Sequence, residues 1–468
     1  MPRLDENRLL PVDPSSRNLA RGLLESIQDL PIISPHGHVD PSWIASDAPF
    51  GNAAELFVTP DHYVLRMLYS QGISLDQLGV PRKDGTPVEV DPREVWRVFA
   101  SHYHLFRGTP SKLWIDYSLE HVFGLADYLH ADTADAFFDH IGSCLAAPEF
   151  RPRALFERFN IEVLATTESP LDTLEHHATV AASNMRGRMV TTYRPDNVVD
   201  PAVPGFDANL KAFAEITGQN TLSWQGYLEA HRIRRRAFIA HGATASDHGH
   251  PTARTLNLPD SEAEALFNRI ASGKGSAEDA ENFRAHMLCE MAKMSLDDGL
   301  VMQLHCGSRR NHSPQVFDNF GADKGFDIPG PIDYVDAFAP LLDLVGHNPD
   351  FALIVFTLDE TTWGRELAPL AGVYPALKLG PAWWFFDSAD GMMRFREMTT
   401  ETAGFYNTVG FNDDTRAFTS IPARHDVARR VDCAYLANLV GQGRLTEPEA
   451  FDLAFELTNG LVKKAYRL

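Results

Sequence analysis

The sequence predicts an α/β protein, a distorted (β/α)8 TIM barrel with an inserted, mostly helical subdomain after the first strand. Short apolar runs alternate along the chain with stretches of helical periodicity, which is the order that parallel βα units give. Eight such runs can be counted, and eight units favour a closed barrel over an open sheet. About 120 residues of mostly helical pattern separate the first run from the second, and a connection that long must carry structure of its own.

The predicted elements begin with an N-terminal helix that Ser15 or Ser16 caps and whose apolar residues share one face. The first strand is the apolar run 30–33, which Pro35 ends. The expected divisions are 1–41 with the first helix and strand, 42–155 with a helical subdomain that caps the barrel mouth, and 156–468 with the remaining barrel and the C-terminal helices.

Seven further apolar runs are expected to be strands, with helices such as 261–272 and 276–295 between them. The last helix carries a capping box, in which Thr446 is the N-cap and Glu449 the third helical residue. A short apolar run can also be part of a buried helix, so the count depends on every run being a strand. The seven runs are 161–166, 189–193, 237–240, 301–305, 353–356, 376–379 and 405–410.

Composition excludes several classes of protein. Among 468 residues, 42 Lys and Arg stand against 63 Asp and Glu, a net charge of −21, which argues against nucleic acid and anionic membranes as partners. No apolar stretch is long enough to span a membrane, and the N-terminus lacks the apolar run of a signal peptide. The four cysteines show no C-x-x-C spacing, which excludes a disulfide scaffold and a zinc finger. A cytoplasmic location is therefore expected.

Several histidines and an aspartate follow the predicted strands, where a βα barrel carries its chemistry. His36 and His38 come after the first strand, and alternation along an extended segment puts both imidazoles on one face. Such a pair chelates a divalent cation, zinc above all. His305 at the fifth strand and Asp414 after the eighth would complete a four-ligand site. A role in packing stays open for each histidine taken alone.

This joint pattern resembles the amidohydrolase superfamily, and a longer series of motifs resembles its uronate isomerase (glucuronate isomerase) family. The matching blocks follow the order of that family and extend over nearly the whole chain. They are 31–41, 61–63, 166–177, 194–196, 246–249, 303–311, 325–327, 383–385, 414–418 and 424–425.

The resemblance implies an aldose–ketose isomerisation of hexuronates: D-glucuronate to D-fructuronate, and D-galacturonate to D-tagaturonate. This chemistry needs a base for the C2 proton, an electrophile for the enediolate oxygen and a cationic clamp for the carboxylate. Asp414 is the candidate base. The same aspartate with His36, His38 and His305 is the candidate metal site, with zinc as the expected ion.

Other residues of these blocks are candidates for substrate contacts. His62 and Tyr63, in the inserted region, are expected to donate hydrogen bonds to substrate oxygens, and Tyr63 to carry a proton to C1. Arg194 and Arg416 are candidates for the clamp on the carboxylate or the enediolate, because a guanidinium binds such groups in a planar, bidentate way.

Trp383, Trp384 and His248 complete the candidate substrate-binding residues. Either tryptophan could line the sugar site, although such residues are more often found in a core. His248 follows the fourth strand and is expected to be a hydrogen-bond donor rather than a metal ligand.

Two other classes of function stay open. A metal-dependent hydrolase of an amide, ester or lactone would use the same barrel, but it often carries a further histidine after the sixth strand, where 357–359 has none. A non-catalytic protein that binds sugar acids would be expected to have lost the pair His36 and His38 or Asp414. Assembly into a homo-oligomer also stays open.

Overall fold

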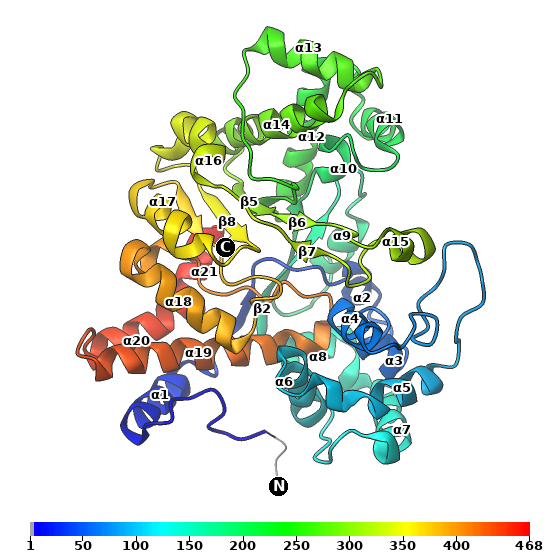
Figure 1. The fold of residues 1–468 in the computed structure, drawn as a ribbon, viewed down its shortest axis with the longest axis vertical. Helices are drawn as coiled ribbons and strands as arrows, with labels where there is room; N and C mark the ends of the chain where they lie inside the picture. Colours follow the sequence, from blue (N-terminus) through cyan, green and yellow to red (C-terminus); the bar gives the residue numbers. More distant parts are fainter. Residues whose placement is uncertain (1–3) are drawn as a thin grey trace.

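The core of the fold is a parallel sheet of seven strands, seen near the centre of the ribbon in Figure 1. The structure is a computed structural model that describes residues 4–468. Neighbouring strands in the sheet follow chain order, so each new strand is added beside the previous one. The strands, in that order, are β1 Ile32–Ser34, β2 Ile161–Glu168, β3 Arg188–Tyr193, β4 Ala245–His248, β5 Val301–Cys306, β8 Leu353–Thr357 and β9 Leu377–Leu379.

One face of this sheet curls around an apolar core. Side chains from six of the strands meet there in one cluster, so the sheet is curled rather than flat. Val462 and Tyr466 of the C-terminal helix pack into the same cluster. The residues from the sheet and from the segment beyond β9 are Ile33, Val163, Ala165, Val190, Ala245, Val301, Ile354, Phe356 and Val409.

Seven helices lie between β1 and β2, and most of their apolar side chains share one core with those two strands. Trp96 and Phe99 are fully buried in that core, together with Ile32 of β1 and Ile161 of β2. In Figure 1 these helices, drawn in blue to cyan, gather beside one end of the sheet. They are α2 Pro41–Ser46, α3 Ala53–Phe57, α4 His62–Ser70, α5 Pro92–Ser101, α6 Pro110–Tyr117, α7 Ala134–Leu145 and α8 Pro152–Arg158.

The remaining helices alternate with the later strands or close the ends of the chain, and α1 packs against α19 and α20. They are α1 Pro14–Ile27, α9 Glu175–Ala181, α10 Asp196–Val199, α11 Phe206–Thr217, α12 Trp224–Ala240, α13 Asp260–Ala271, α14 Ala277–Asp298, α15 Pro314–Phe320, α16 Val335–Leu341, α17 Ala368–Val373, α18 Ala389–Ala403, α19 Ile421–Gly441, α20 Glu447–Phe455 and α21 Leu461–Tyr466. A short antiparallel hairpin, β6 Ser308–Arg309 with β7 Ile328–Pro329, lies over the sheet.

The predicted fourth strand is wrong. Residues 237–240 form the last turn of α12, with Phe238 buried against the core and Ile239 exposed at the surface. The true strand, β4, begins at Ala245 and is polar in sequence, although all its side chains are buried. The search for apolar runs therefore made two errors here. It assigned the apolar end of a helix as a strand, and it did not detect a true strand whose residues are mostly polar.

The predicted eighth strand is reduced to a single bridge. Phe405–Asn407 is a turn of 3₁₀ helix, and Thr408 alone pairs with Leu379 of β9. Further along, the carbonyl of Thr415 accepts a hydrogen bond from the backbone N–H of His38, at 3.0 Å. The segment from 408 to 415 thus contacts both edges of the sheet.

The predicted helix ends are mostly confirmed. The capping box of Thr446 and Glu449 is present at α20, and Ser276 caps α14. The first helix is an exception, because Asp13 rather than Ser15 or Ser16 accepts the capping hydrogen bond. Pro14 then takes the first helical position, where its missing N–H costs nothing.

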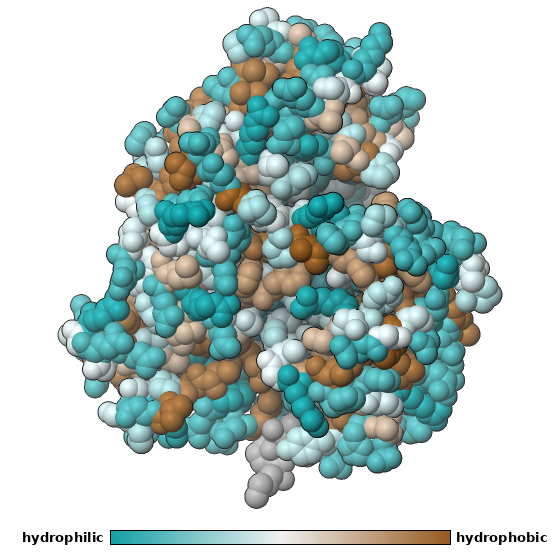
Figure 2. Space-filling model, viewed as in Figure 1, coloured by the Kyte–Doolittle hydropathy of each residue, from teal (hydrophilic) through white to brown (hydrophobic). Residues whose placement is uncertain are grey.

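Figure 2 shows mostly hydrophilic side chains on this face, with small, scattered apolar patches. None of the helices among residues 4–468 is both long and apolar enough to cross a membrane.

Candidate active site

A cavity of about 500 Å³ opens at the carboxyl ends of the strands. It collects side chains from the segment after β1, from the end of β5, from the loop after β9 and from α4. All but one of the residues predicted for the site line it: His36, His38, His62, Tyr63, Arg194, His305, Trp383, Trp384, Asp414 and Arg416.

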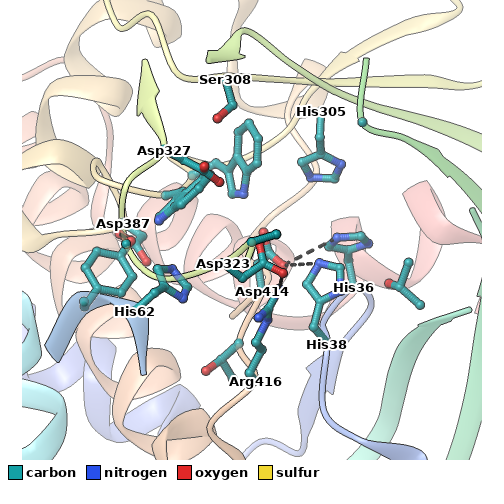
Figure 3. Close-up of a pocket in the computed structure, with 18 of the residues that line it drawn as sticks. His36, His38, His62, His305, Ser308, Asp323, Asp327, Asp387, Asp414 and Arg416 are labelled. Atoms are coloured by element: carbon teal, nitrogen blue, oxygen red, sulfur yellow. Dashed lines mark hydrogen bonds and ion pairs between the residues drawn. The ribbon is translucent and has the colours of Figure 1, made fainter. Parts of the chain in front are cut away.

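Asp414 lies against the histidine pair (Figure 3). Its Oδ1 is 3.5 Å from Nε2 of His36 and 3.3 Å from Nε2 of His38. The backbone of Asp414 has a φ of 40°, in the left-handed region that non-glycine residues rarely adopt. A strained backbone of this kind persists where the surroundings hold it, and it aims the carboxylate at the two imidazoles.

His305 is oriented by a buried carboxylate. Its Nδ1 lies 2.6 Å from Oδ1 of Asp247, and its ring stacks between those of His36 and Phe356. The contact with Asp247 makes Nδ1 the N–H donor, so Nε2 carries the lone pair. Asp247 also forms an ion pair with Arg194, at 3.1 Å, which couples the two site residues.

The donor set fits a divalent cation. Both ring nitrogens of His36, Nε2 of His305 and Oδ1 of Asp414 are buried and have no hydrogen-bond partner among the described residues. The ligand atoms of His36, His38 and Asp414 lie within 4.8 Å of one another, as do those of His36, Asp247 and His305. Because Asp247 already binds His305 and Arg194, the first group is the better metal site.

The charges in the cavity favour this arrangement. Burial lowers the pKa of His38 to about 3, so its imidazole is neutral and able to ligate at neutral pH. Burial alone would raise the pKa of Asp414, but His36, His38 and His305 outweigh that effect and lower it to about 2. Asp414 is therefore a carboxylate at neutral pH.

Arg194 is held by two carboxylates at the wall of the cavity. Its Nε donates to Oδ2 of Asp196 at 2.8 Å, and its Nη1 faces Asp247. The backbone N–H of Gly249 donates to both oxygens of Asp196. A Cβ at position 249 would overlap Nη2 of Arg194, so a larger residue there would displace the guanidinium from its present position.

The start of α4 positions His62 and Tyr63. Asp61 is the N-cap and accepts hydrogen bonds from the backbone N–H groups of Tyr63 and Val64. The His62 ring meets Trp384 edge to face, with 5.4 Å between the centroids. Burial lowers the pKa of His62 to about 3, so this imidazole is neutral.

The hydroxyl of Tyr63 is already engaged in the structure. It donates to Oδ1 of Asp387 at 2.8 Å and accepts from the backbone N–H of Phe385 at 3.0 Å. Arg424 donates to the other oxygen of Asp387, at 2.7 Å. Sequence reasoning placed neither Asp387 nor Arg424 in the site. Asp387 follows β9 in a stretch with no recognisable spacing, whereas Arg424 lies in a block that resembles the family.

Arg416 is more exposed than Arg194. It pairs with Asp323, at 3.0 Å, and 44% of its side chain is accessible. Arg310, which was not among the predicted site residues, lines the same cavity and lies over the Trp384 ring, 5.3 Å from its centroid. The indole nitrogen of Trp384 is buried and has no hydrogen-bond partner within residues 4–468.

His248 is the predicted site residue that does not line the cavity. It is the last residue of β4, fully buried, with Nε2 at 3.4 Å from the hydroxyl of Ser246. The neighbouring Asp247 faces His305 and Arg194 instead. Because the sequence prediction placed the fourth strand at 237–240, which is the end of α12, it did not identify Asp247 of β4 as the residue that reaches the site.

These features define the class: an α/β enzyme that carries imidazoles, carboxylates and guanidinium groups in one cavity at the ends of parallel strands. More particularly, the chain belongs to the glucuronate isomerase family, whose model matches residues 12–461. A uronate isomerase of Mesorhizobium japonicum is 63% identical, with 99% of each chain covered. The uronate isomerase of Rhizobium meliloti is 60% identical over the same share of both chains.

Solved structures agree with this assignment. The glucuronate isomerase of Caulobacter crescentus is 60% identical and superposes with a TM-score of 0.98, covering 99% of this chain and 97% of that one. The uronate isomerase of Thermotoga maritima, at 26% identity, covers 99% of both chains with a TM-score of 0.92. The hydrolase and sugar-acid-binding alternatives are not favoured by these likenesses.

Proposed function

We propose that this enzyme isomerises hexuronates, converting D-glucuronate to D-fructuronate and D-galacturonate to D-tagaturonate. The observation that carries the proposal is the meeting in one cavity of a buried carboxylate, Asp414, with the imidazoles of His36 and His38 and the guanidinium of Arg194. The names of the similar proteins, uronate and glucuronate isomerase, support the choice of substrate.

Asp414 is the proposed base. It takes the proton from C2 of the open-chain aldose, the electron pair of the C2–H bond forms the C1–C2 double bond, and O1 gains the charge of the former carbonyl. O1 then takes the proton of the C2 hydroxyl and a proton returns to C1, which leaves a hydroxyl at C1 and a ketone at C2. An ionised Asp414 is the form that this step requires.

Two arginines supply the positive charge. Arg416 can exchange its exposed pair with Asp323 for the substrate carboxylate, because that pair is weak in water. Arg194 is fixed by Asp196 and Asp247, so it can stabilise an enediolate oxygen without moving. The two charges thus have separate tasks.

Proton return to C1 involves Tyr63 and the carboxylate that it touches. The Tyr63 hydroxyl donates to Asp387, and burial raises its pKa well above the usual value, so Tyr63 holds its proton at neutral pH. His62, neutral and at the cavity wall, can donate a hydrogen bond to a substrate hydroxyl. We propose that Tyr63 delivers the proton to C1 with Asp387 as its partner.

The remaining candidates shape the sugar site. Trp384 offers an unpartnered indole N–H to a substrate hydroxyl, and Trp383 presents its ring to His305, 4.7 Å between centroids. His248 supports β4 from outside the cavity and is not proposed as a substrate contact.

A divalent cation, zinc first, would be held by His36, His38 and Asp414, with His305 beside them. When bound, it would supply a Lewis-acidic charge that holds substrate oxygens in place. The proton transfers described above are performed by side chains of the protein.

The proposal is tested with D-glucuronate and D-galacturonate labelled with ¹³C at C1. Isomerisation converts the labelled carbon from an aldehyde, mainly in its hemiacetal form, to a primary alcohol, which ¹³C NMR resolves. Appearance of the alcohol signal with either sugar supports the proposal. Folded, zinc-loaded protein that leaves both sugars unchanged would exclude it.

The same proposal extends to the architecture around the site. We propose a distorted (β/α)8 barrel in which the segment 408–415 takes the eighth position, since Thr408 pairs with β9 and Thr415 accepts a hydrogen bond from His38. Residues 42–155 would form the helical subdomain over its mouth, between 1–41 and 156–468. The contribution of α4 to the cavity supports that division. A cytoplasmic location and a homo-oligomeric assembly remain proposals.

A further inference from the structure

A second group of metal-ligating side chains lies behind Arg194, separate from the group around Asp414. Asp196 at the start of α10, His248 at the end of β4 and His250 just beyond it place one ligand atom each within 4.8 Å of one another. Asp196 lines the substrate cavity, whereas both histidines are buried. The two groups share no residue.

The two histidines have nitrogens without partners. Nδ1 of His248 and Nε2 of His250 are buried and make no hydrogen bond with the described residues. The side chains are 0% and 4% exposed, so bulk water does not reach them. Burial lowers the pKa of both rings, which leaves each neutral with a lone pair on one nitrogen. Buried polar atoms of this kind are normally satisfied, by protein, water or an ion.

Asp196 supplies the negative charge. Burial is the largest single effect and would raise its pKa, but Arg194 and His250 together outweigh it and lower the pKa, so the carboxylate stays ionised. Each oxygen accepts from Gly249 at 3.1 Å, and Oδ2 also accepts from Arg194 at 2.8 Å. Oδ1 is the less occupied of the two and has a further lone pair for a ligand.

We propose that Asp196, His248 and His250 form a second divalent-cation site in the wall of the substrate cavity. Two imidazoles and one carboxylate are the ligands of borderline ions such as zinc and cobalt, and magnesium and calcium prefer oxygen alone. Three protein ligands leave a position open for water.

The position beside Arg194 gives this site an effect on the reaction. A cation bound to Asp196 competes with the guanidinium for the same carboxylate and adds positive charge next to it. The site therefore binds more weakly than the first, and its occupation loosens Arg194. The effect on the reaction rests on the proposed function, whereas the binding of a cation by Asp196, His248 and His250 does not. Excess zinc is expected to inhibit the enzyme.

Metal stoichiometry is the primary test. Metal-free full-length protein is titrated with Zn²⁺ and bound metal is measured by equilibrium dialysis. Wild type is expected to bind two ions, a tight one and a weaker one. His250→Gln is expected to lose the weaker ion, and His38→Asn the tighter one. A second ion that persists in His250→Gln, or a wild type that binds one ion, overturns the proposal.

A matched control separates ligation from general loss of a buried histidine. His177 is also buried, with an unpartnered Nδ1, but it belongs to no group of ligands. His177→Gln is expected to keep both ions.

Anomalous scattering at the zinc edge covers the case in which His250→Gln fails to fold. Crystals of wild type soaked in Zn²⁺ are expected to show a peak between Asp196, His248 and His250. A peak at His36 and His38 with none at the second position contradicts the inference. For the catalytic consequence, turnover of wild type should fall two- to tenfold as zinc rises from one to several equivalents, and turnover of His250→Gln should not. Two bound ions without isomerase activity would refute the proposed function and leave the second site intact.

Discussion

At the scale of single residues, the site depends on carboxylates that orient other groups. Asp414 faces two imidazoles, Asp247 orients His305 and Arg194, and Asp387 binds Tyr63. If any of these aspartates were replaced by a neutral side chain of the same shape, the groups that it contacts would lose their negatively charged partner. The chemistry proposed for the cavity therefore rests on aspartates in different roles.

Asp247→Asn tests the orienting role. The amide keeps the shape of the side chain but removes the charge shared by His305 and Arg194. We expect kcat/KM to fall about 10- to 100-fold, the usual effect of losing a group that orients a ligand. Steady-state kinetics with D-glucuronate and a zinc titration measure the effect.

The control is an ion pair that does not line the cavity and whose arginine is buried. Asp298 pairs with Arg235 between α12 and α14. Asp298→Asn is expected to lower stability and to leave kcat/KM within about twofold, because surface and core changes outside a site act on folding. Equal kinetic losses in Asp247→Asn and Asp298→Asn would contradict a specific role for Asp247.

At the scale of elements, helix ends and strand ends place the functional groups. Asp61 caps α4 and so fixes where His62 and Tyr63 lie. Asp61→Ala should cost about 1 kcal/mol of stability, the usual value of an N-cap, and should also lower kcat/KM. Thermal unfolding and kinetics on the same preparation measure both effects.

The cap of α20 provides the comparison. Thr446→Ala removes an equivalent capping hydrogen bond in a helix that packs on α1 and α19. It should cost a similar free energy of unfolding and leave kinetics unchanged. If the two variants lose activity equally, the cap of α4 has no special link to the site.

The end of β2 gives a prediction about pH. Burial raises the pKa of Glu168 to about 7, against 4.5 for the free side chain. A raised pKa means that the folded state binds the proton more tightly, so the stabilisation is complete below about pH 4.5 and is lost as the pH rises through about 7. The loss amounts to about 3 kcal/mol at most.

Glu168→Gln cannot ionise, so its free energy of unfolding should fall less than that of wild type between pH 4.5 and 7.5. Urea unfolding at several pH values measures this difference. Glu449 is the control, because hydrogen bonds from Thr446 lower its pKa, and Glu449→Gln should not flatten the profile. Parallel profiles for wild type and Glu168→Gln would show that Glu168 does not titrate in this range.

The sequence was sufficient to predict strands and candidate site residues where an apolar strand is followed directly by a motif. It was insufficient where buried positions are occupied by polar residues. The pair His36 and His38 follows an apolar strand and was found. The strand β4 contains Ser, Asp and His, so no hydrophobic pattern marks it, and Asp247 was missed with it. Asp387 and Arg424 reach the cavity only through the packing of α19 against the loop after β9, which no local pattern encodes.

At the scale of the whole molecule, charge bears on how substrate arrives. The net charge of −21 repels an anionic hexuronate at long range. The arginines that line the cavity are paired with aspartates: Arg416 with Asp323, Arg194 with Asp196 and Asp247, Arg310 with Asp327, and Arg424 with Asp387. Electrostatic steering is therefore not expected to speed binding. We expect kcat/KM to change less than about twofold between 20 and 200 mM NaCl, where steering would be screened. A steep fall with added salt would show that a local positive field attracts the substrate.

The role of Asp414 as the base is tested by a proton NMR time course in deuterated buffer, with wild type and Asp414→Asn measured side by side. Wild type should convert D-glucuronate to the 2-keto-uronate with deuterium at C1, because the hydroxyl of Tyr63, the proposed donor to C1, exchanges its proton with the deuterated solvent. Asp414→Asn, folded to the same extent, should be slower by at least about a thousandfold, at the upper range for loss of a general base. Equal rates for the two proteins would contradict the assignment of Asp414 as the base, and no ketose from wild type would contradict the account as a whole.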